Sequence, residues 1–391
     1  MGKFGSKWLG DNHATVEDME LSVIGIMNMN IFGIPLVGAD ICGFGGASTT
    51  PDLCARWHAL GGYYPFSRNH RACWGDAQEP WRFNTTKYAP TGQTYMDLMK
   101  DSIQRKYSLV RYFYTQMTQI SLNNNTYTTI YKPLFFEFPD DNGAYENIAN
   151  NVMIGPAIKT SVNAKSITDK ETDFYFPEGT WCSLFEPIGE CIYNEESANV
   201  TLGSQIHQSY AHLREGFVVP MQNATKLNAG TTVDLQNQPV DFHILGSFRV
   251  PGLMAWSAVG LYLNDDGLTT TLAGNVNQYR LNVGYSQSQG EQLTITISQL
   301  MTATNFKKAD NCTAVNKADY LQSIYVYNAT AFKAHDTLWV SVAYNNDINN
   351  YVTVGLASFD QATNRIIYDG SALGNLLCLS NVFRIVLKNL S

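Results

Sequence analysis

Trp8 and Asp11 stand together near the start of the chain, in the segment Lys-Trp-Leu-Gly-Asp-Asn from residue 7 to residue 12. Enzymes that cleave glycosidic bonds normally use two carboxyl groups, one that donates a proton and one that attacks or stabilises an oxocarbenium-like transition state. Asp11, with an aromatic ring beside it, can supply one of these groups. An Asp next to a Trp is also common in surface turns, so a structural role stays open as the alternative.

Further polar side chains follow two apolar segments. Residues 34–39 are apolar and end in Asp40, Phe44 lies on the loop beyond, and residues 61–67 lead into Arg68 and His70. Both segments are typical of buried parallel strands. Side chains that follow such strands meet on one rim of an α/β barrel, where these folds keep their chemistry.

Helices are predicted between these strands and after them. Thr15 can cap a helix over residues 16–32, Pro51 and Asp52 begin a second helix that ends near residue 60, and residues 94–120 have the apolar spacing of a long third helix. Alternation of strands and helices is typical of a βα repeat. The sequence therefore predicts that one rim collects the acids, the cation and the aromatic rings.

Four motifs in this region resemble glycoside hydrolase family 31, the family of lysosomal and intestinal α-glucosidases. They are Trp-Leu-Gly-Asp at residues 8–11, Gly-Ile-Pro-Leu-Val-Gly-Ala-Asp-Ile-Cys-Gly-Phe at 33–44, Leu-Cys-Ala-Arg-Trp at 53–57 and Tyr-Pro-Phe-Ser-Arg-Asn-His at 64–70. The resemblance continues at residues 133–139, 176–181 and 212–220, and it weakens near residues 261–267.

The resemblance implies a role for each motif residue in the first part of the site. Asp11 would be the general acid/base, which protonates the leaving oxygen and then activates water. Trp8 and Phe44 would line the glucose pocket with their apolar faces. The substrate would be an α-glucoside oligosaccharide, and the family acts without a cofactor.

The remaining motif residues have both a functional and a structural interpretation. His70 would hydrogen-bond a sugar hydroxyl, or it is a core histidine whose ring nitrogens are satisfied. Asp40 and Arg68 would form a charged pair that shapes the pocket floor, or they are a purely structural ion pair.

The chain also departs from the family pattern. The family's nucleophile lies in a segment of the type Trp-x-Asp-Met-Asn-Glu, and no such segment occurs in residues 1–391. We therefore expect the nucleophile, with the missing N-terminal half of the barrel, to come from the same gene or from a separate chain, and residues 1–391 alone to be inactive. The alternative is a non-catalytic glycan-binding or structural subunit derived from the family.

The predicted fold class is α/β plus all-β. Residues 1–143 would form the C-terminal third of a (β/α)8 TIM barrel, because a complete barrel takes on the order of 250 residues. Two antiparallel β-sandwich domains would follow, a proximal one over residues 144–222 and a distal one over residues 223–391. Strands are expected at 233–245, 292–297 and 337–343.

Composition excludes several classes of partner. The net charge of −8 argues against nucleic acid and anionic membranes, since both require basic patches. No run of apolar residues is long enough to predict a transmembrane helix. The histidines and cysteines show no spacing typical of metal ligands.

Cysteines and glycosylation sequons favour a secretory-pathway protein, lysosomal, vacuolar or extracellular. The resemblance implies a disulfide between Cys42 and Cys54; Cys182 with Cys191 and Cys312 with Cys378 are further candidate pairs, and Cys73 is left over. No signal peptide is visible in residues 1–7, which favours a true start upstream. The candidate N-glycosylation sites are Asn84, Asn124, Asn199, Asn223, Asn311, Asn328 and Asn389.

Overall fold

The computed structural model describes residues 5–389 apart from several internal segments. These segments are 123–128, 225–233, 236–237, 249–255, 266, 268, 272–273, 287–291, 302–318, 330–336, 345–346, 348–349 and 372–375. Contacts divide the chain into two compact units. The N-terminal unit comprises Met1–Tyr107, Asn123–Gly179 and Tyr193–His212, and the C-terminal unit comprises Ser108–Leu122, Thr180–Ile192 and Leu213–Ser391.

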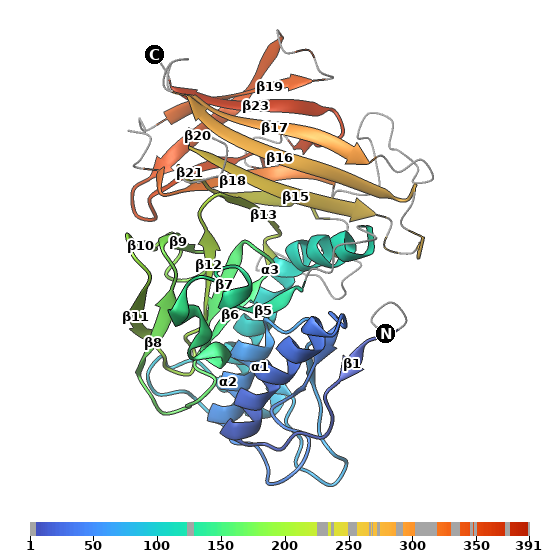
Figure 1. The fold of residues 1–391 in the computed structure, drawn as a ribbon, viewed down its shortest axis with the longest axis vertical. Helices are drawn as coiled ribbons and strands as arrows, with labels where there is room; N and C mark the ends of the chain where they lie inside the picture. Colours follow the sequence, from blue (N-terminus) through green and yellow to red (C-terminus); the bar gives the residue numbers. More distant parts are fainter. Residues whose placement is uncertain are drawn as a thin grey trace. The chain divides into compact units, whose positions relative to one another are not determined.

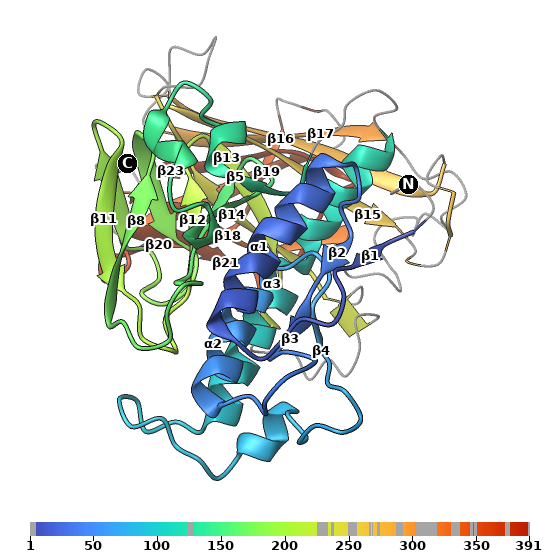
Figure 2. The same cartoon turned by 60° about the horizontal axis from the view of Figure 1, so that its bottom comes forward.

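The first part of the N-terminal unit is a βα repeat. Strand β1 (Lys7–Trp8) pairs in parallel with β2 (Val37–Gly38), and β3 (Asp40–Ile41) pairs in parallel with β4 (Arg68–Asn69). Helix α1 (Val16–Ile31) connects β1 to β2, and α2 (Pro51–Gly61) connects β3 to β4. Figure 2 shows these short strands along one flank of α1 and α2. The expected part of a TIM barrel is therefore present as parallel strands with helical connections.

Local sequence explains where these helices begin. The Thr15 hydroxyl accepts a hydrogen bond from the Asp18 backbone N–H at 3.1 Å, and the Thr50 hydroxyl accepts one from the Leu53 N–H at 3.2 Å. Such caps satisfy amides that have no partner inside the helix. Helix α3 (Tyr95–Leu122) follows, and the boundary between the two units falls within it.

The rest of the N-terminal unit is mainly antiparallel. Strands β5 (Tyr131–Pro133), β6 (Asn151–Ile154) and β7 (Ile158–Ser161) pair in that order, and β8 (Glu171–Phe176) pairs with β11 (Ala198–Gly203). Strand β12 (Tyr210–Arg214) runs from this unit into the next. The short 3-10 helices η2 (Leu134–Phe136), η3 (Asn142–Tyr145) and η4 (Ile148–Asn150) lie between β5 and β6, and η1 (Pro80–Phe83) lies earlier, between β4 and α3.

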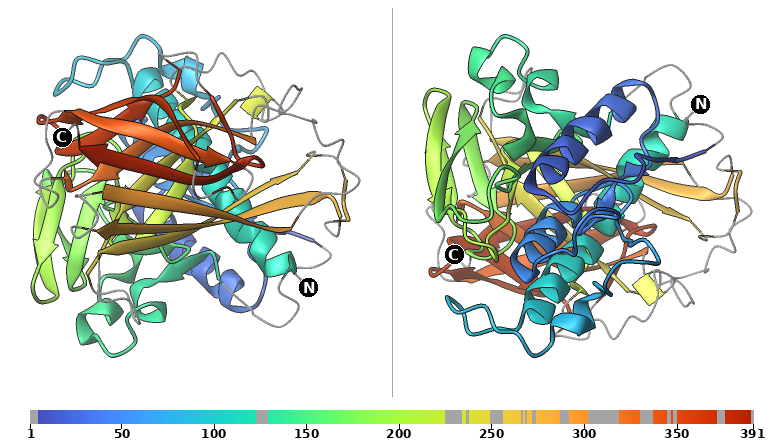
Figure 3. Two further views of the ribbon diagram at one scale, coloured as in Figure 1. Left: turned by 90° about the horizontal axis from the view of Figure 1, so that it is seen from above. Right: turned by 90° about the horizontal axis from the view of Figure 1, so that it is seen from below.

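The C-terminal unit is dominated by one eleven-stranded sheet in the order β14-β13-β15-β16-β17-β23-β19-β20-β21-β18-β22 (Figures 1 and 3). Its strands are β13 (Phe217–Met221), β14 (Val240–Leu245), β15 (Ser257–Asp265), β16 (Val276–Ser286), β17 (Gln292–Met301), β18 (Tyr320–Tyr327), β19 (Thr337–Tyr344), β20 (Tyr351–Asp360), β21 (Arg365–Asp369), β22 (Leu377–Cys378) and β23 (Val382–Asn389). Strands β9 (Gly179–Ser183) and β10 (Cys191–Asn194) precede it.

The distal β domain was predicted to be a sandwich, but its sheet closes into a barrel. Strand β14 also pairs in parallel with β18, from Val240 opposite Leu321 to Ile244 opposite Val326, so all strands except β22 form a closed barrel. A closed barrel leaves no strand edge with unpaired N–H and C=O groups. The predicted strands at 292–297 and 337–343 are confirmed as parts of β17 and β19. Only residues 240–245 of the strand predicted at 233–245 are strand, and part of the remainder lies outside the described residues.

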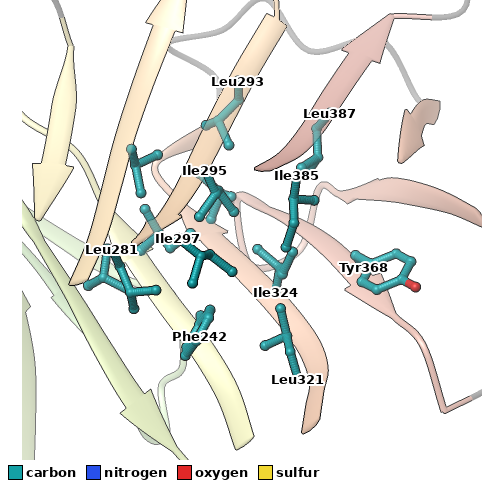
Figure 4. Close-up of a cluster of buried hydrophobic side chains, with 14 of the residues drawn as sticks. Phe242, Leu281, Leu293, Ile295, Ile297, Leu321, Ile324, Tyr368, Ile385 and Leu387 are labelled. Atoms are coloured by element: carbon teal, nitrogen blue, oxygen red, sulfur yellow. The ribbon is translucent and has the colours of Figure 1, made fainter. Parts of the chain in front are cut away.

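The core of the barrel consists of alternate residues of these strands. Leu293, Ile295 and Ile297 of β17 are buried, and the residues between them are partly exposed. Figure 4 shows these three side chains in one cluster with Phe242 and Ile385. The period of two places one face of each strand inside. The predicted domain limits at residues 143 and 222 stay predictions.

No helix in the part of the chain that the structure describes is long and apolar enough to span a membrane.

Candidate functional site

Five of the predicted site residues lie on or just after the short strands β1, β3 and β4 in the N-terminal unit. We call Trp8, Asp40, Phe44, Arg68 and His70 the strand-end cluster. Trp8 ends β1, while Asp40 and Arg68 are register partners at the start of β3 and β4. Phe44 and His70 lie on the loops just after these two strands. The βα repeat therefore brings together residues up to 62 positions apart in the sequence.

Asp40 is the hydrogen-bond acceptor that connects Trp8 with Arg68. Its side chain is buried, and its two carboxylate oxygens have different partners. Trp8 donates its indole N–H to Oδ2 at 3.0 Å, and the Arg68 guanidinium donates to Oδ1 at 2.7 Å. The guanidinium also lies 5.6 Å from the Trp8 ring centroid, within cation–π range. Asp40 thus fixes the orientation of both an aromatic ring and a cation.

Phe44 connects the aromatic members of the cluster. Its ring centroid lies 6.4 Å from Trp8 in an edge arrangement and 5.0 Å from the His70 ring. Trp74, which the sequence analysis did not single out, contacts Phe44 edge-on at 6.3 Å and is 76% exposed. Trp74 lies four residues after the last motif residue, His70, and nothing in the spacing of residues 71–80 connects it to the pocket residues.

Asp11 lies beside this cluster in the chain and is exposed. Gly10, which precedes it, has φ of +105°, a conformation that a residue with a side chain rarely adopts. Asn12, which follows it, exchanges two hydrogen bonds with the backbone of Asp40, at 2.9 and 3.0 Å, and accepts the Phe44 N–H at 2.7 Å. Within the described ranges, no hydrogen bond or ion pair engages the Asp11 carboxylate.

A buried amide, Gln78, holds the loops that carry the cluster. Its side-chain nitrogen donates to the carbonyl oxygens of Gly43 and His70, both at 3.1 Å, and to Asn69 Oδ1 at 3.0 Å. Arg71 adds hydrogen bonds to the carbonyls of Phe44 and Gly45. Sequence reasoning missed both residues because their partners are mostly backbone atoms far along the chain.

The disulfide between Cys42 and Cys54 is present and ties the loop after β3 to α2. His58 packs on it, and its Nδ1–H donates to the Cys54 carbonyl at 2.8 Å. Burial lowers the pKa of the His58 imidazole to about 4. The two sulfurs and this imidazole lie within 4.8 Å of one another, but sulfurs in a disulfide are not the thiolates that metal sites require.

Two more predicted cysteine features are visible. Cys182 and Cys191 form a disulfide, and Cys73 is free and exposed. Cys378 is disulfide-bonded, whereas Cys312, its predicted partner, lies outside the described residues.

The candidate glycosylation sites differ in exposure. Asn84 and Asn199 are exposed, and Asn223 and Asn328 are half-buried. Asn124 and Asn311 lie outside the described residues, and the side chain of Asn389 does too. Asn84 and Asn199 are therefore the most accessible acceptors among the described side chains.

Comparison with known families matches two successive parts of the chain. Residues 1–116 match the model described as the glycosyl hydrolases family 31 TIM-barrel domain, and residues 127–219 match the family 31 C-terminal domain. The first match contains Asp11 and the whole strand-end cluster.

Individual relatives and a solved structure agree with this match. The lysosomal alpha-glucosidase of Mus musculus is 32% identical over 255 residues, which cover 61% of this chain and 25% of that protein. Alpha-xylosidase 1 of Arabidopsis thaliana is 27% identical over 282 residues, 70% of this chain and 28% of that protein. The crystal structure of the Tris-bound glucosidase II alpha subunit superposes with a TM-score of 0.75 at 20% identity, covering 98% of this chain and 38% of that one. The chain thus spans about a quarter of the length of the curated relatives it matches.

Proposed function

The chain belongs to glycoside hydrolase family 31, and we propose that it forms part of a retaining α-glucosidase that releases terminal α-linked glucose from oligosaccharides. One observation carries this proposal. Asp11 is an exposed carboxylate without a partner among the described residues, and Asn12 joins it in sequence to the backbone of the strand-end cluster.

Asp11 is proposed as the general acid/base. In the first step it donates its proton to the leaving glycosidic oxygen while a nucleophilic carboxylate forms a glycosyl ester. In the second step it accepts a proton from the water that cleaves this ester. An exposed carboxylate that no neighbour engages can carry out both transfers, because no hydrogen bond must break first.

The nucleophile is proposed to come from outside residues 1–391. A retaining mechanism places the second carboxylate about 5 Å from the acid/base. Asp40 is the acid among the five cluster residues, but its two oxygens accept hydrogen bonds from Trp8 and Arg68. A carboxylate held in this way serves geometry, and attack on the sugar would require it to leave both donors.

The other cluster residues are proposed to bind the glucose ring. Trp8 and Phe44 offer apolar faces to the C–H groups of the sugar, and His70 hydrogen-bonds a hydroxyl. Asp40 and Arg68 form the charged floor. The α-xylosidase among the relatives makes a second α-linked sugar a natural comparison in any assay.

A secretory-pathway location is proposed on the same basis. The disulfides Cys42–Cys54 and Cys182–Cys191 support it, since such bonds persist in oxidising compartments. Treatment of the cell-derived protein with peptide N-glycosidase should convert Asn84 and Asn199 to Asp, which peptide mass spectrometry detects. Unmodified Asn at both positions would contradict passage through a glycosylating compartment.

The role of Asp11 is tested in the catalytically competent protein, in the form in which cells contain it. The Asp11→Ala variant should hydrolyse an aryl α-glucoside at least about a hundredfold more slowly than the wild type. Azide should restore turnover, because it attacks the glycosyl ester without a general base. The product should be the α-glucosyl azide, whose anomeric configuration NMR reports.

The matched control is Glu17→Ala, which removes an exposed acid from the first turn of α1. It should keep wild-type rates. Formation of the β-glucosyl azide by the Asp11 variant would instead identify Asp11 as the nucleophile. Unchanged hydrolysis would exclude it from the chemistry.

The proposed division of the active site has its own test. Residues 1–391, expressed alone, should leave aryl α-glucosides and α-xylosides intact. Hydrolysis by this chain alone would place the nucleophile within it. Failure of the cell-derived protein to cleave either substrate would favour the non-catalytic glycan-binding subunit.

A further inference from the structure

A hollow of about 660 Å³ lies on the outer face of the β-barrel in the C-terminal unit. It is formed by the neighbouring strands β17, β23, β19 and β20, which are among the orange to red strands of Figure 1. None of its lining residues belongs to the strand-end cluster.

Two aromatic residues stand out in the lining of this hollow. Trp339 of β19 is 43% exposed and Tyr351 of β20 is 41% exposed. Leu338 and Val340, which flank Trp339, are buried, so Trp339 lies on the outward face of its strand. Large aromatic side chains exposed together at one place typically mark a binding surface.

The strand register places these aromatic residues at opposite ends of the hollow. Trp339 is opposite Lys388 of β23, whereas Tyr351 is opposite Ala343, four residues further along β19. This offset corresponds to roughly 14 Å along the strand. Ser341 and Thr353 are register partners between the two ends.

The lining between the aromatic residues is suited to hydrogen bonding. The Ser341 and Thr353 hydroxyls lie 3.3 Å apart. Arg384 Nη1 donates to the Tyr351 hydroxyl at 3.5 Å, which orients the phenol, and Gln292 adds an amide. None of the described residues that line the hollow is acidic.

This combination matches the chemistry of a sugar chain. The C–H face of a pyranose packs on an aromatic ring, and its hydroxyls exchange hydrogen bonds with hydroxyl, amide and guanidinium groups. Two rings separated along the strand fit a short linear chain better than a single sugar. A ligand of this kind also agrees with membership of a family that acts on glycosides.

We propose that the hollow on β17, β23, β19 and β20 is a second glycan-binding site, which takes a short neutral glucose oligosaccharide between Trp339 and Tyr351. The site retains a glycan substrate without contributing to bond cleavage. The proposal is independent of the role of Asp11, because binding is measured without hydrolysis.

The test is isothermal titration of residues 1–391 with maltotetraose. Trp339→Ala and Tyr351→Ala should each weaken binding about tenfold, since each removes one stacking surface. Trp339→Phe should retain most of the affinity. Leu300→Ala is the matched control, because Leu300 is an exposed apolar residue of β17 that does not line the hollow, and it should bind like the wild type.

Trp81→Ala removes an exposed ring that belongs neither to the hollow nor to the strand-end cluster, and it should leave maltotetraose affinity unchanged. Circular dichroism and thermal unfolding of every variant check that the barrel is folded. Binding that is lost in Trp81→Ala but kept in Trp339→Ala would overturn the proposal.

Two further outcomes would also overturn it. The first is that the wild-type chain does not bind maltotetraose. The second is that sedimentation detects self-association of the chain, which Trp339→Ala abolishes while glycan binding stays the same. The second result would identify the face as a contact between copies of the chain.

Discussion

Asp40 illustrates how a single buried carboxylate organises several neighbours. It accepts hydrogen bonds from Trp8 and Arg68, and its backbone is paired with Asn12. A buried charge is stable only when donors surround it, so these contacts are mutually dependent. The position of the Trp8 ring therefore depends on the identity of residue 40.

Asp40→Asn should lower the free energy of unfolding of residues 1–391 by about 2 kcal/mol. The amide can still accept one hydrogen bond, but the Arg68 guanidinium loses its counter-charge. The loss is below that of a fully buried pair because the Arg68 side chain is 38% exposed. Urea unfolding followed by tryptophan fluorescence measures it.

Glu20→Gln provides the control for this substitution. Glu20 and Lys165 form an exposed ion pair at 3.6 Å. Its removal should lower the free energy of unfolding by less than about 0.5 kcal/mol. If Asp40→Asn and Glu20→Gln lowered the free energy of unfolding equally, the ion pair of Asp40 would contribute no more to stability than an exposed ion pair.

Trp74 extends the cluster beyond the residues that the sequence motifs contain. In the catalytically competent protein, Trp74→Ala should raise the KM for maltotriose about fivefold and change that for an aryl glucoside little. The reason is that an exposed ring beside Phe44 can stack on a sugar beyond the cleaved bond, which contributes about 1 kcal/mol. Steady-state kinetics with both substrates measure the difference.

Trp81→Ala is the matched control for Trp74. Trp81 is also largely exposed, on η1, and no ring contact links it to the strand-end cluster in the described part of the chain. An equal change of KM in both variants would mean that any change in the segment between β4 and α3 affects KM, without stacking of Trp74 on the sugar.

Motif residues were easier to predict than the residues that hold them. Asp40, Arg68 and His70 end apolar runs, so the strand pattern alone indicated that they share a rim. Gln78 and Asn12 act through backbone carbonyls and amides, for which any polar residue looks equivalent in a sequence. Their roles become visible only when the loops are placed in three dimensions.

Among the helices and strands, α2 is held in place by three features: a cap, a disulfide and a buried histidine. It begins at a Thr50 cap, is covalently tied through Cys54 to Cys42, and buries His58 against that disulfide. The sequence predicted the helix, because proline and aspartate in the first turn are strong start signals. The burial of His58 could not be predicted, because histidines occur on exposed helix faces as well as on buried ones.

The neutral state of His58 couples the stability of this element to pH. Its folded-state pKa is about 4, below the value of 6.5 for an unfolded chain. Above pH 6.5 the imidazole is neutral in both states, and stability is complete. As the pH falls from 6.5 towards 4, the unfolded state binds a proton that the folded state rejects, so stability is lost.

At pH 5 this loss amounts to about 2 kcal/mol from His58. His58→Gln should therefore show a smaller decrease of the unfolding free energy between pH 7 and pH 5 than the wild type, whatever its stability at pH 7. Urea titrations at several pH values, with the disulfide intact, test this. Parallel pH profiles for the two proteins would refute a buried neutral His58.

At the scale of the whole molecule, the sequence and the structure agree on the change from βα repeat to β-structure. The strand predicted at 292–297 is present within β17, where buried Leu293, Ile295 and Ile297 alternate with partly exposed residues. Closure of the barrel was not predictable, because β14 pairs with β18 about eighty residues later and no local signal records which strands become neighbours.

Barrel closure depends on close approach between β13 and β15, which pair in parallel at Phe217 and Val259. Gly260 is the residue that permits this approach. A Cβ atom there would lie 2.6 Å from the Val218 carbonyl oxygen and 2.7 Å from the Val218 Cβ. Such distances are below van der Waals contact, so one of the two strands would have to shift.

Gly260→Ala should therefore destabilise the barrel by about 2 kcal/mol, the usual effect of overpacking. Gly284→Ala is the matched control on the adjacent strand β16, because a Cβ there meets nothing within 4 Å. Alanine in that open position should change stability by less than about 0.5 kcal/mol. Guanidinium unfolding of both variants makes the comparison, and equal stabilities would mean that β13 and β15 are not held at this distance in solution.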